Sequence, residues 1–434
     1  MTSALLLLTL SASTVAQANG QSTHVWISRH ALEHLPEGEL KDMLTDPDLQ
    51  QMLENGTMFP DGGYPLGDGY AEIAHWEPFQ NRYRDWIAAR CQAPWTDDCA
   101  QNVAFLMGMA SHGMADQTYD ALYYERGKQH DHDSDFGAHS FDQATDVAFM
   151  AIVGRVDYPA DWVPYDTLVE LYAEHGHTVD ADTLATGQNL LRIAILWVGN
   201  ASEDEALTAT ESAYFPWMTS HLDDPTVAGN PPCEGEVLAQ YWQSVYRRLQ
   251  GDLAFAPELI ATFPEGGYGL ETDSTLVESR ISLVFSQAID QDSLAEGVVS
   301  VTDPEGVVVP TTAWLYYGDG SHVLHLAPQQ DWAADTVYTV TVGAGIRTLD
   351  GQETTGSSTL TVSTAPPPAD AGGDSGGDDS GGAPVDEGKG CSTAPGAGTL
   401  VGLALALLAQ AAASTGGRPK RQGRSSGRST TSAT

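Results

Sequence analysis

The pattern of hydrophobic and polar positions divides the chain into two parts with different periods. Between Asn19 and Phe263, apolar residues recur at helical spacing, and the loops between them are rich in Gly, Pro and Asp. This pattern predicts an all-α domain over residues 19–263. Its expected helices cover residues 30–35, 40–54, 76–90, 103–124, 140–153, 165–175, 181–201 and 236–249.

From Gly267 to Thr364 the pattern changes to an alternation with period two, which is typical of strands with one buried face. Alternating runs cover residues 281–285, 298–301, 323–326 and 337–342. Short strands at this spacing predict a β-sandwich over residues 267–364. The segment resembles the immunoglobulin-like modules of bacterial surface proteins, which implies a spacer; His322 and His325 are interpreted as strand residues and not as ligands.

The two ends of the chain carry signals for export and attachment. The apolar run Leu5 to Leu10 and the small residues ending at Ala18 predict a signal peptide over residues 1–18 and a mature chain beginning at Asn19. Residues 365–390 are rich in Pro, Gly, Asp and Ser, which predicts a disordered acidic linker. Residues 391–434 combine Cys391, an apolar run and a basic end. They resemble the MYXO-CTERM type of sorting tail, which implies attachment at the cell surface or outer membrane; a plain membrane anchor would give nearly the same location.

The amino-acid composition limits the classes of partner that the chain is expected to bind. The apolar fraction of 41% is ordinary for a globular protein, but 59 acidic residues against 19 basic ones give a formal charge of −40. A surface of this charge repels polyanions. We therefore expect no nucleic-acid partner.

The cysteines are too few for a disulfide scaffold. Export would permit disulfides, and Cys91 and Cys99 are close enough in sequence to pair. Their spacing is too wide for a zinc knuckle. Cys233 is left without an obvious partner.

The stretch from Phe105 to Tyr124 contains the clearest candidate chemistry. His112, Asp116 and Asp120 follow one another at intervals of four, so on a helix they share one face. Apolar residues cover most of the remaining faces and predict a buried helix, where an imidazole and two carboxylates need partners. A metal ion would satisfy all three. The alternative is a hydrogen-bonded core histidine with two solvated aspartates.

Other segments add ligand candidates in a recognisable order. The chain contains Ser-Thr-His ending at His24, Pro-Asp-Gly around Asp61, His-Trp-Glu-Pro-Phe from His75, the Ser-His-x-x-Ala-Asp motif of residues 111–116, and Ala-His-Ser around His139. This succession resembles the zinc-dependent phospholipase C family, and in particular the catalytic domain of glycosylphosphatidylinositol-specific phospholipase D. The resemblance is good over residues 19–156 and loose up to residue 263. Single-strand-specific zinc nucleases share the same fold and metal scheme.

The resemblance implies three zinc ions per chain and assigns their ligands. One zinc would be held by Asp61, His75, His112 and Asp116, with Asp116 bridging to a second. His24 and the amino group and carbonyl of Asn19 would complete the second, since cleavage after Ala18 leaves Asn19 five residues before His24, the spacing seen in the family.

The third zinc site departs from the family pattern. Family members carry a carboxylate four residues after the histidine, whereas here Asp142 follows His139 at three. We assign His139 and Asp142 to this site; His132 with Asp135 is the rival pair, and His130 is a further candidate. Asp120 occupies the position of a family histidine and would be the third ligand.

These residue types fit phosphodiester hydrolysis. The implied reaction is attack of a zinc-bound hydroxide on the phosphorus of a phospholipid or glycolipid, at a membrane surface, with Asp61 as general base. The alternatives are a single-strand-type zinc nuclease, which a basic groove would support, and a non-catalytic surface binding protein that retains the fold.

Overall fold

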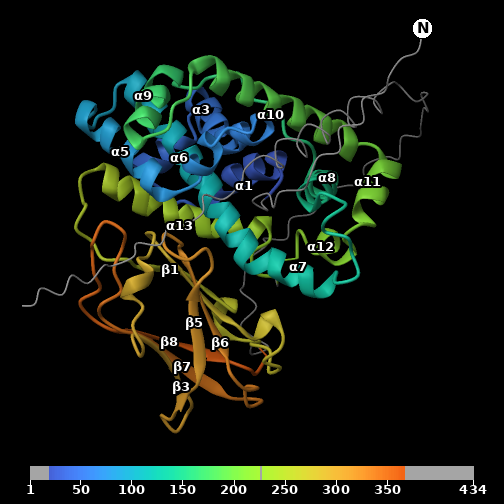
Figure 1. Ribbon diagram of the computed structural model, residues 1–434, viewed down its shortest axis with the longest axis vertical. Coiled ribbons are helices and arrows are strands. Elements are labelled where there is room, and N and C mark those ends of the chain that lie inside the picture. The colour runs from blue at the N-terminus through green and yellow to red at the C-terminus, as the bar shows by residue number, and fades with distance from the viewer. Residues whose placement is uncertain (1–18, 225–226, 367–434) are drawn as a thin grey trace, which may run out of the picture.

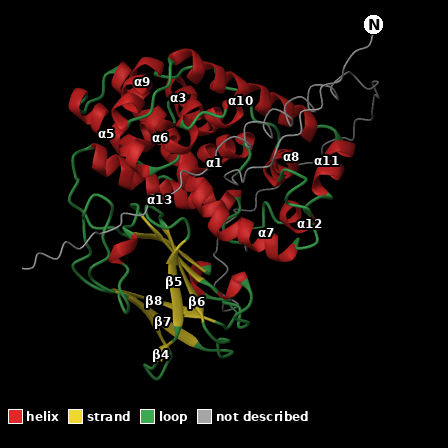
Figure 2. Ribbon diagram, viewed as in Figure 1, coloured by secondary structure: helices red, strands yellow, loops and turns green. Residues whose placement is uncertain are grey.

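The computed structural model describes residues 19–224 and 227–366. Helices pack together in the first part of the chain, and two antiparallel β-sheets follow and lie against them (Figures 1 and 2). The arrangement confirms the predicted fold class, an all-α domain followed by an immunoglobulin-like β-sandwich. The predicted signal peptide, nearly all of the acidic linker and the sorting tail lie outside the described residues.

The helical domain is built from α-helices of very different length, joined by short loops. They are α1 (Gln21–His34), α2 (Glu39–Leu44), α3 (Pro47–Met58), α4 (Tyr70–Ala74), α5 (Glu77–Arg90), α6 (Asp97–Thr118), α7 (Glu125–His130), α8 (Phe141–Val153), α9 (Tyr165–His175), α10 (Ala181–Ser202), α11 (Glu205–Ser212), α12 (Pro216–Ser220) and α13 (Pro231–Leu249). Two further helical segments are not α-helical. The 3-10 helix η1 (Phe59–Leu66) is wound more tightly than an α-helix, and the π-helical turn η2 (Tyr119–Tyr124) is wound more widely.

Several helices begin or end away from the predicted residues: α1 begins at Gln21 and not at residue 30, and α13 begins at Pro231 and not at residue 236. Two other differences have clear local reasons. The helix expected over residues 40–54 is divided into α2 and α3, because the Asp46 side chain accepts a hydrogen bond from Asp48 N at 2.9 Å and Pro47 begins α3. The helix expected over residues 103–124 changes at Tyr119 into the π-helical turn. A π-helical turn inside a helix is frequent at functional sites.

Helix α6 lies at the centre of the helical domain. Every residue from Asn102 to Thr118 is buried. Gly56 on α3 and Gly108 on α6 face the backbone of the other helix, and neither position has room for a Cβ atom. The two helices therefore pack at backbone contact, which fixes the end of α3 beside the polar half of α6.

The disulfide predicted from the sequence is present. Cys91 and Cys99 are joined with a Cα–Cα distance of 5.8 Å, which links the end of α5 to the beginning of α6. Cys233 has no disulfide partner among the described residues; its Sγ accepts a hydrogen bond from Gly229 N at 3.2 Å.

The sandwich consists of two four-stranded antiparallel sheets. Their orders are β1-β2-β6-β5 and β4-β3-β7-β8. The strands are β1 (Leu259–Phe263), β2 (Ile281–Phe285), β3 (Val299–Thr302), β4 (Val308–Val309), β5 (Thr311–Leu315), β6 (Val323–Pro328), β7 (Val337–Val342) and β8 (Ser358–Ser363). Short 3-10 turns η3 (Glu265–Gly267), η4 (Val277–Ser279) and η5 (Gln291–Ser293) lie between them.

The core of the sandwich follows from the alternation read in the sequence. Leu283, Leu324 and Val340 are fully buried between the sheets. Strand β1 lies inside the segment predicted to be helical, before residue 267. Its residues pair with β2 and therefore belong to the sandwich. The β-sandwich thus starts at or before Leu259, earlier than the predicted residue 267.

The sandwich is docked on the helical domain through buried polar groups. At the first turn of α5, the Glu77 carboxylate accepts hydrogen bonds from Arg248 of α13 and from Ala288 N of the sandwich. His322 Nε2 lies 3.1 Å from Glu77 Oε2. His322, predicted to be only a strand residue, therefore takes part in the contact between the two domains.

Within residues 19–224 and 227–366, no helix combines the length and apolar character that a bilayer span requires.

Candidate metal centre

Four of the predicted ligands converge at the centre of the helical domain. Asp61 comes from η1, His75 directly follows α4, and His112 and Asp116 are one turn apart on α6. Both histidines and Asp116 are buried, and Asp61 is partly buried. The stripe predicted on one face of α6 is therefore completed by two ligands from short connecting segments.

The ligand atoms of this four-residue cluster have the spacing of a coordination shell. His75 Nε2 lies 3.0 Å from His112 Nε2, 3.2 Å from Asp61 Oδ1 and 3.3 Å from Asp116 Oδ2. His112 Nε2 lies 3.4 Å from Asp61 Oδ1 and 3.3 Å from Asp116 Oδ2. Four atoms at about 2.0–2.1 Å from a tetrahedral zinc ion are about 3.3–3.4 Å apart. The residues present fit such an ion.

Backbone carbonyls orient both imidazoles. His75 Nδ1 donates to Ala71 O and His112 Nδ1 donates to Thr57 O, each at 2.7 Å. These contacts place the ring proton on Nδ1 and leave the Nε2 lone pair of each ring directed at the centre of the cluster, which is the usual outer contact of a metal-binding histidine. Thr57 is the penultimate residue of α3, so the close packing of α3 on α6 sets this orientation.

His24 approaches the same cluster from α1. Its Nε2 lies 3.0 Å from the other oxygen of Asp116, Oδ1, and its ring stacks on that of His112 with centroids 4.0 Å apart. Both nitrogens of His24 and Asp116 Oδ1 are buried without a hydrogen-bond partner among the described residues. Buried polar atoms without partners are costly, and a second cation between His24 and Asp116 would satisfy them. Asp116 thus presents one oxygen to each half of the centre.

The beginning of α1 is anchored inside the domain. Asp146 of α8 accepts hydrogen bonds from Ser22 N at 3.2 Å and from Thr23 N at 2.8 Å. Gly20 packs against this carboxylate, with no room for a Cβ atom. Burial raises the pKa of Asp146 to about 6, although the hydrogen bonds from Thr23 and Ser22 oppose the shift. These contacts place Asn19 and His24 beside the cluster.

Two residues that the sequence did not reveal lie next to the predicted ligands. Asn19 Nδ2 donates to Glu234 Oε2 at 2.6 Å, and Glu234 Oε1 is buried without a partner among the described residues. Burial, reinforced by the charge of Asp116, raises the pKa of Glu234 well above its usual range. Gln21 donates a side-chain hydrogen bond to Asp61 Oδ2. No local spacing in the sequence marks either residue, because both reach the site only through packing between distant helices.

The predicted ligands of the third zinc are not brought together as completely. Asp120 begins the π-helical turn and is buried, but it is outside the groups of converging ligand atoms found among the described residues. Burial is the largest cause of its strongly raised pKa, which the hydrogen bond from Tyr317 opposes and the charges of Asp116 and Asp142 increase. His139 stacks on Tyr214 with centroids 3.6 Å apart.

His130 and His132, the alternative ligands considered for the third zinc, lie in different surroundings. His130 Nε2 lies 2.6 Å from Glu278 Oε1 of the sandwich, and its ring stacks on Trp217. His132 is exposed and lies 3.4 Å from Asp133. His130 therefore contacts the neighbouring domain, and His132 has no buried ligand partner within the described part of the chain.

Burial and the nearby imidazoles have opposing effects on the pKa values of the two carboxyl groups in the cluster. Burial alone would raise the pKa of Asp61, but the imidazoles of His112 and His75 outweigh it and hold this pKa below its usual range. The pKa of Asp116 is lowered in the same way, with His112 and His24 opposing burial. The site therefore favours ionised carboxylates, the form in which they bind a cation.

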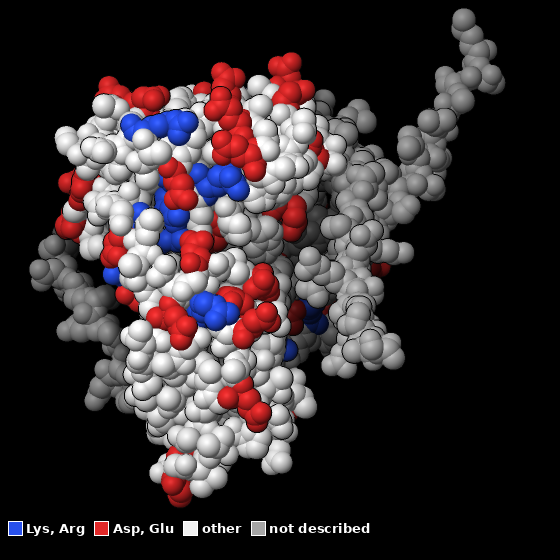
Figure 3. Space-filling model, turned by 60° about the vertical axis from the view of Figure 1, so that its left-hand side comes forward, with Lys and Arg blue, Asp and Glu red and all other residues white. Residues whose placement is uncertain are grey.

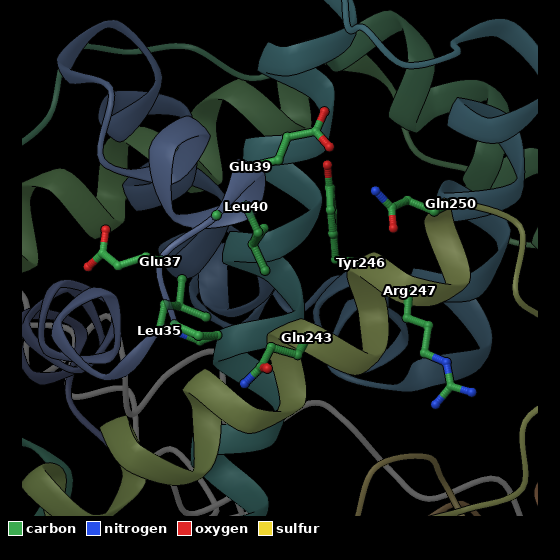
Figure 4. Close-up of a pocket in the computed structure, with 10 residues that line it drawn as sticks. Leu35, Glu37, Glu39, Leu40, Gln243, Tyr246, Arg247 and Gln250 are labelled. Carbon is green, nitrogen blue, oxygen red and sulfur yellow. The ribbon is translucent and has the colours of Figure 1, made fainter.

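A separate hollow of about 240 Å³ lies on the surface between the α1–α2 connection and α13 (Figure 4). Its lining mixes acidic, basic and amide side chains, among them Glu39, Arg247 and Gln250. It contains none of the converging ligands, so we assign it no role in the metal centre.

Residues 255–364 match the family of bacterial Ig-like domains. The chain is also 36% identical over 135 residues to phosphatidylinositol-glycan-specific phospholipase D of Rattus norvegicus, covering 29% of this chain and 16% of that protein. For the protein of the same name from Homo sapiens the identity is 34% over 118 residues, covering 25% and 14%. The chain thus spans about a sixth of the length of these curated relatives.

Among solved structures, domains 1–6 of the surface layer protein SbsC align with 80% of this chain and 45% of that one, at 12% identity and a TM-score of 0.21. A similarity this weak supports no inference about this chain.

Proposed function

We propose that this chain is a zinc-dependent phosphodiester hydrolase that acts on phospholipids or glycolipids. The observation that carries the proposal is the four-residue cluster of Asp61, His75, His112 and Asp116, in which each histidine Nε2 lies 3.0–3.4 Å from the other histidine and from both carboxylates. The partial similarity to phosphatidylinositol-glycan-specific phospholipases D supports the substrate class.

The residues divide into three candidate zinc sites. The four-residue cluster would hold the first. Asp116 Oδ1 and His24, 3.0 Å apart, would hold the second together with the backbone of Asn19. Asp120, His139 and Asp142 would hold the third, and their incomplete convergence makes this the weakest of the three.

Bound zinc would neutralise charge on the phosphoryl oxygens and lower the pKa of a water molecule. We assign the role of proton acceptor to Asp61; one of its oxygens faces His75 and His112, and the other lies on the side of Gln21, from which it accepts a hydrogen bond. The Gln21 amide fixes the plane of this carboxylate. A carboxylate held in this way can act as the general base.

The charge of the chain favours a lipid headgroup over a polynucleotide. Acidic side chains are spread over both domains on the face seen in Figure 3, and basic ones are few. Because the chain has a formal charge of −40, it would repel a nucleic acid. Tyr64, whose ring lies 5.5 Å from that of His75, and Trp76 are partly exposed beside the cluster and offer apolar surface to a headgroup.

We further propose that the protein is exported and anchored at the cell surface. The support is the signal-peptide pattern of residues 1–18 and the Gly-Cys, apolar and basic succession of residues 391–434. This location would bring the metal centre to a membrane surface.

The decisive experiment measures zinc per chain and hydrolysis on protein expressed with residues 1–18, so that processing exposes the Asn19 amino group. Substrates are phosphatidylcholine, phosphatidylinositol, a glycosylphosphatidylinositol and single-stranded DNA. His112→Ala is compared with His177→Ala, a matched control whose imidazole binds Asp68 at 2.7 Å outside the cluster.

The proposal predicts two or three zinc ions, lipid hydrolysis, and loss of both in His112→Ala but not in His177→Ala. Cleavage of DNA alone would contradict the lipid substrate and indicate a nuclease. Fewer than two zinc ions and no hydrolysis would contradict the enzyme and leave a surface binding protein.

A further inference from the structure

A loop of the Ig-like domain reaches the helix that carries the metal ligands. The segment between β5 and β6 contacts Gln117, the residue after Asp116. Gln117 Oε1 accepts hydrogen bonds from His322 N at 2.8 Å and from Ser321 Oγ at 3.4 Å. Figure 1 shows the β-sandwich lying directly against the helical domain. This loop is therefore docked within one residue of the bridging ligand.

Tyr317 of this loop connects two ligand-bearing segments. Its hydroxyl donates to Asp120 Oδ2, one turn beyond Asp116. Its ring meets that of Trp76, the residue after His75, edge to face with centroids 5.1 Å apart. Trp76 is held in turn by Glu72, whose Oε1 accepts from the indole N–H at 2.9 Å. The tyrosine side chain is 39% exposed and so reaches the surface, while its hydroxyl is directed inward to the buried Asp120.

The second carboxylate oxygen of Asp120, Oδ1, is not the one that accepts the Tyr317 hydrogen bond. Asp120 is 3% exposed, and its Oδ1 is buried without a hydrogen-bond partner among the described residues. One oxygen fixed by a hydrogen bond and one left free is the arrangement of a ligating carboxylate, whose outer partner sets its orientation. A buried acceptor without a partner also indicates a missing ligand.

We propose that the Ig-like domain belongs to the metal centre, with Tyr317 acting as the positioning residue that holds Asp120 as a ligand of the weakest metal site. This inference rests on the proposed zinc dependence of the chain. It replaces the expected spacer role of the sandwich, because removing the domain would release Asp120.

Other contacts join the same domain to the helical domain near Tyr317. Tyr316 OH lies 3.3 Å from Glu125 Oε1, and Arg280 lies 3.5 Å from Glu125 Oε2. Both contacts join the sandwich to the first residue of α7, directly after the π-helical turn. The hydroxyl of Tyr316 therefore contacts α7 and not Asp120.

The test compares Tyr317→Phe with Tyr316→Phe in the full chain. Each change removes one hydroxyl from the same loop, but only the first releases Asp120. Zinc affinities are measured by competition with a chromophoric chelator, with no substrate present. Tyr317→Phe is expected to weaken one class of zinc site by roughly 10- to 100-fold and to leave the others unchanged. Tyr316→Phe is expected to match the wild type.

Asp120→Asn provides a second variant, because an amide still accepts the Tyr317 hydrogen bond but lacks the charge that a zinc ligand supplies. It should lose the same class of zinc, with a melting temperature near that of the wild type measured without zinc. Equal zinc affinities in wild type and Tyr317→Phe would overturn the inference while leaving the proposed function intact. A wild-type chain that binds no zinc would overturn both.

Discussion

The imidazoles of His75 and His112 face each other through their Nε2 atoms at 3.0 Å. Because each ring donates its Nδ1 proton to a backbone carbonyl, the facing Nε2 atoms are the positions at which a cation can bind. Two Nε2 atoms this close in a buried site repel each other unless a proton or a metal ion lies beside them. This relationship leads to the first prediction.

Removing the metal should destabilise the protein. A ligand that binds only the folded chain stabilises it by about 4 kcal/mol when it is present at a thousand times its dissociation constant. We therefore expect a strong zinc chelator to lower the melting temperature by several degrees, and added zinc to restore it. Thermal unfolding followed by circular dichroism checks this, and His112→Ala should show a much smaller response. An unchanged melting temperature in the wild type would contradict a metal in the cluster.

Asp116 is predicted to serve two metals at once, since its oxygens lie 3.3 Å from His112 Nε2 and 3.0 Å from His24 Nε2. Asp116→Asn replaces one of these oxygens with a donor. We expect loss of at least one zinc and a fall in kcat/KM of roughly a thousandfold, which corresponds to several kcal/mol of electrostatic stabilisation. Elemental analysis and initial rates test this. Asp68→Asn, which alters a carboxylate paired with His177, is the control and should retain its zinc.

The contact between the domains depends on a buried carboxylate. Glu77 binds Arg248, whose other partner Asp350 is half exposed, and it also contacts His322 and Ala288 N. Glu77→Ala leaves Arg248 largely uncompensated and should cost about 3–5 kcal/mol. Urea unfolding measures this loss. Lys41→Ala, which removes an exposed pair with Glu37, should cost less than about 1 kcal/mol. Equal effects of the two changes would show that Glu77 does not secure the interface.

The Ig-like domain should lose stability in acid through His325. Burial, followed by the charges of Arg280 and Arg126, lowers the pKa of this histidine to about 3. An unfolded chain has a histidine pKa of about 6.5. Between these values only the unfolded chain binds the proton, so the stability present above about pH 6.5 falls as the pH decreases, by up to about 1.4 kcal/mol per pH unit.

The measurement for this prediction is the slope of unfolding free energy against pH between about 6.5 and 3. His325→Asn retains a polar contact for Ser282, whose Oγ lies 2.8 Å from His325 Nδ1, but does not titrate. Its slope should be smaller than that of the wild type, since all other titrating groups are shared. Identical slopes would contradict a neutral buried His325.

The sequence alone determined the features that depend on neighbours along the chain. Helical and alternating periods predicted the two fold classes in their correct order. The four-residue interval placed His112 and Asp116 on one face of α6, and the short separation of Cys91 and Cys99 predicted their disulfide. Family resemblance added His24, Asp61 and His75, which the structure brings to the same place.

Tertiary structure decided the contacts between segments far apart in the chain. The meeting of Asn19 with Glu234, the hydrogen bond from Gln21 to Asp61, and the insertion of Tyr317 beside Asp120 leave no periodic signal in the sequence. Local spacing encodes which face of a helix or strand a residue occupies, but not which face of another element will cover it. That choice depends on the packing of whole helices and of the sandwich, so the boundary of the candidate metal centre became visible only in three dimensions.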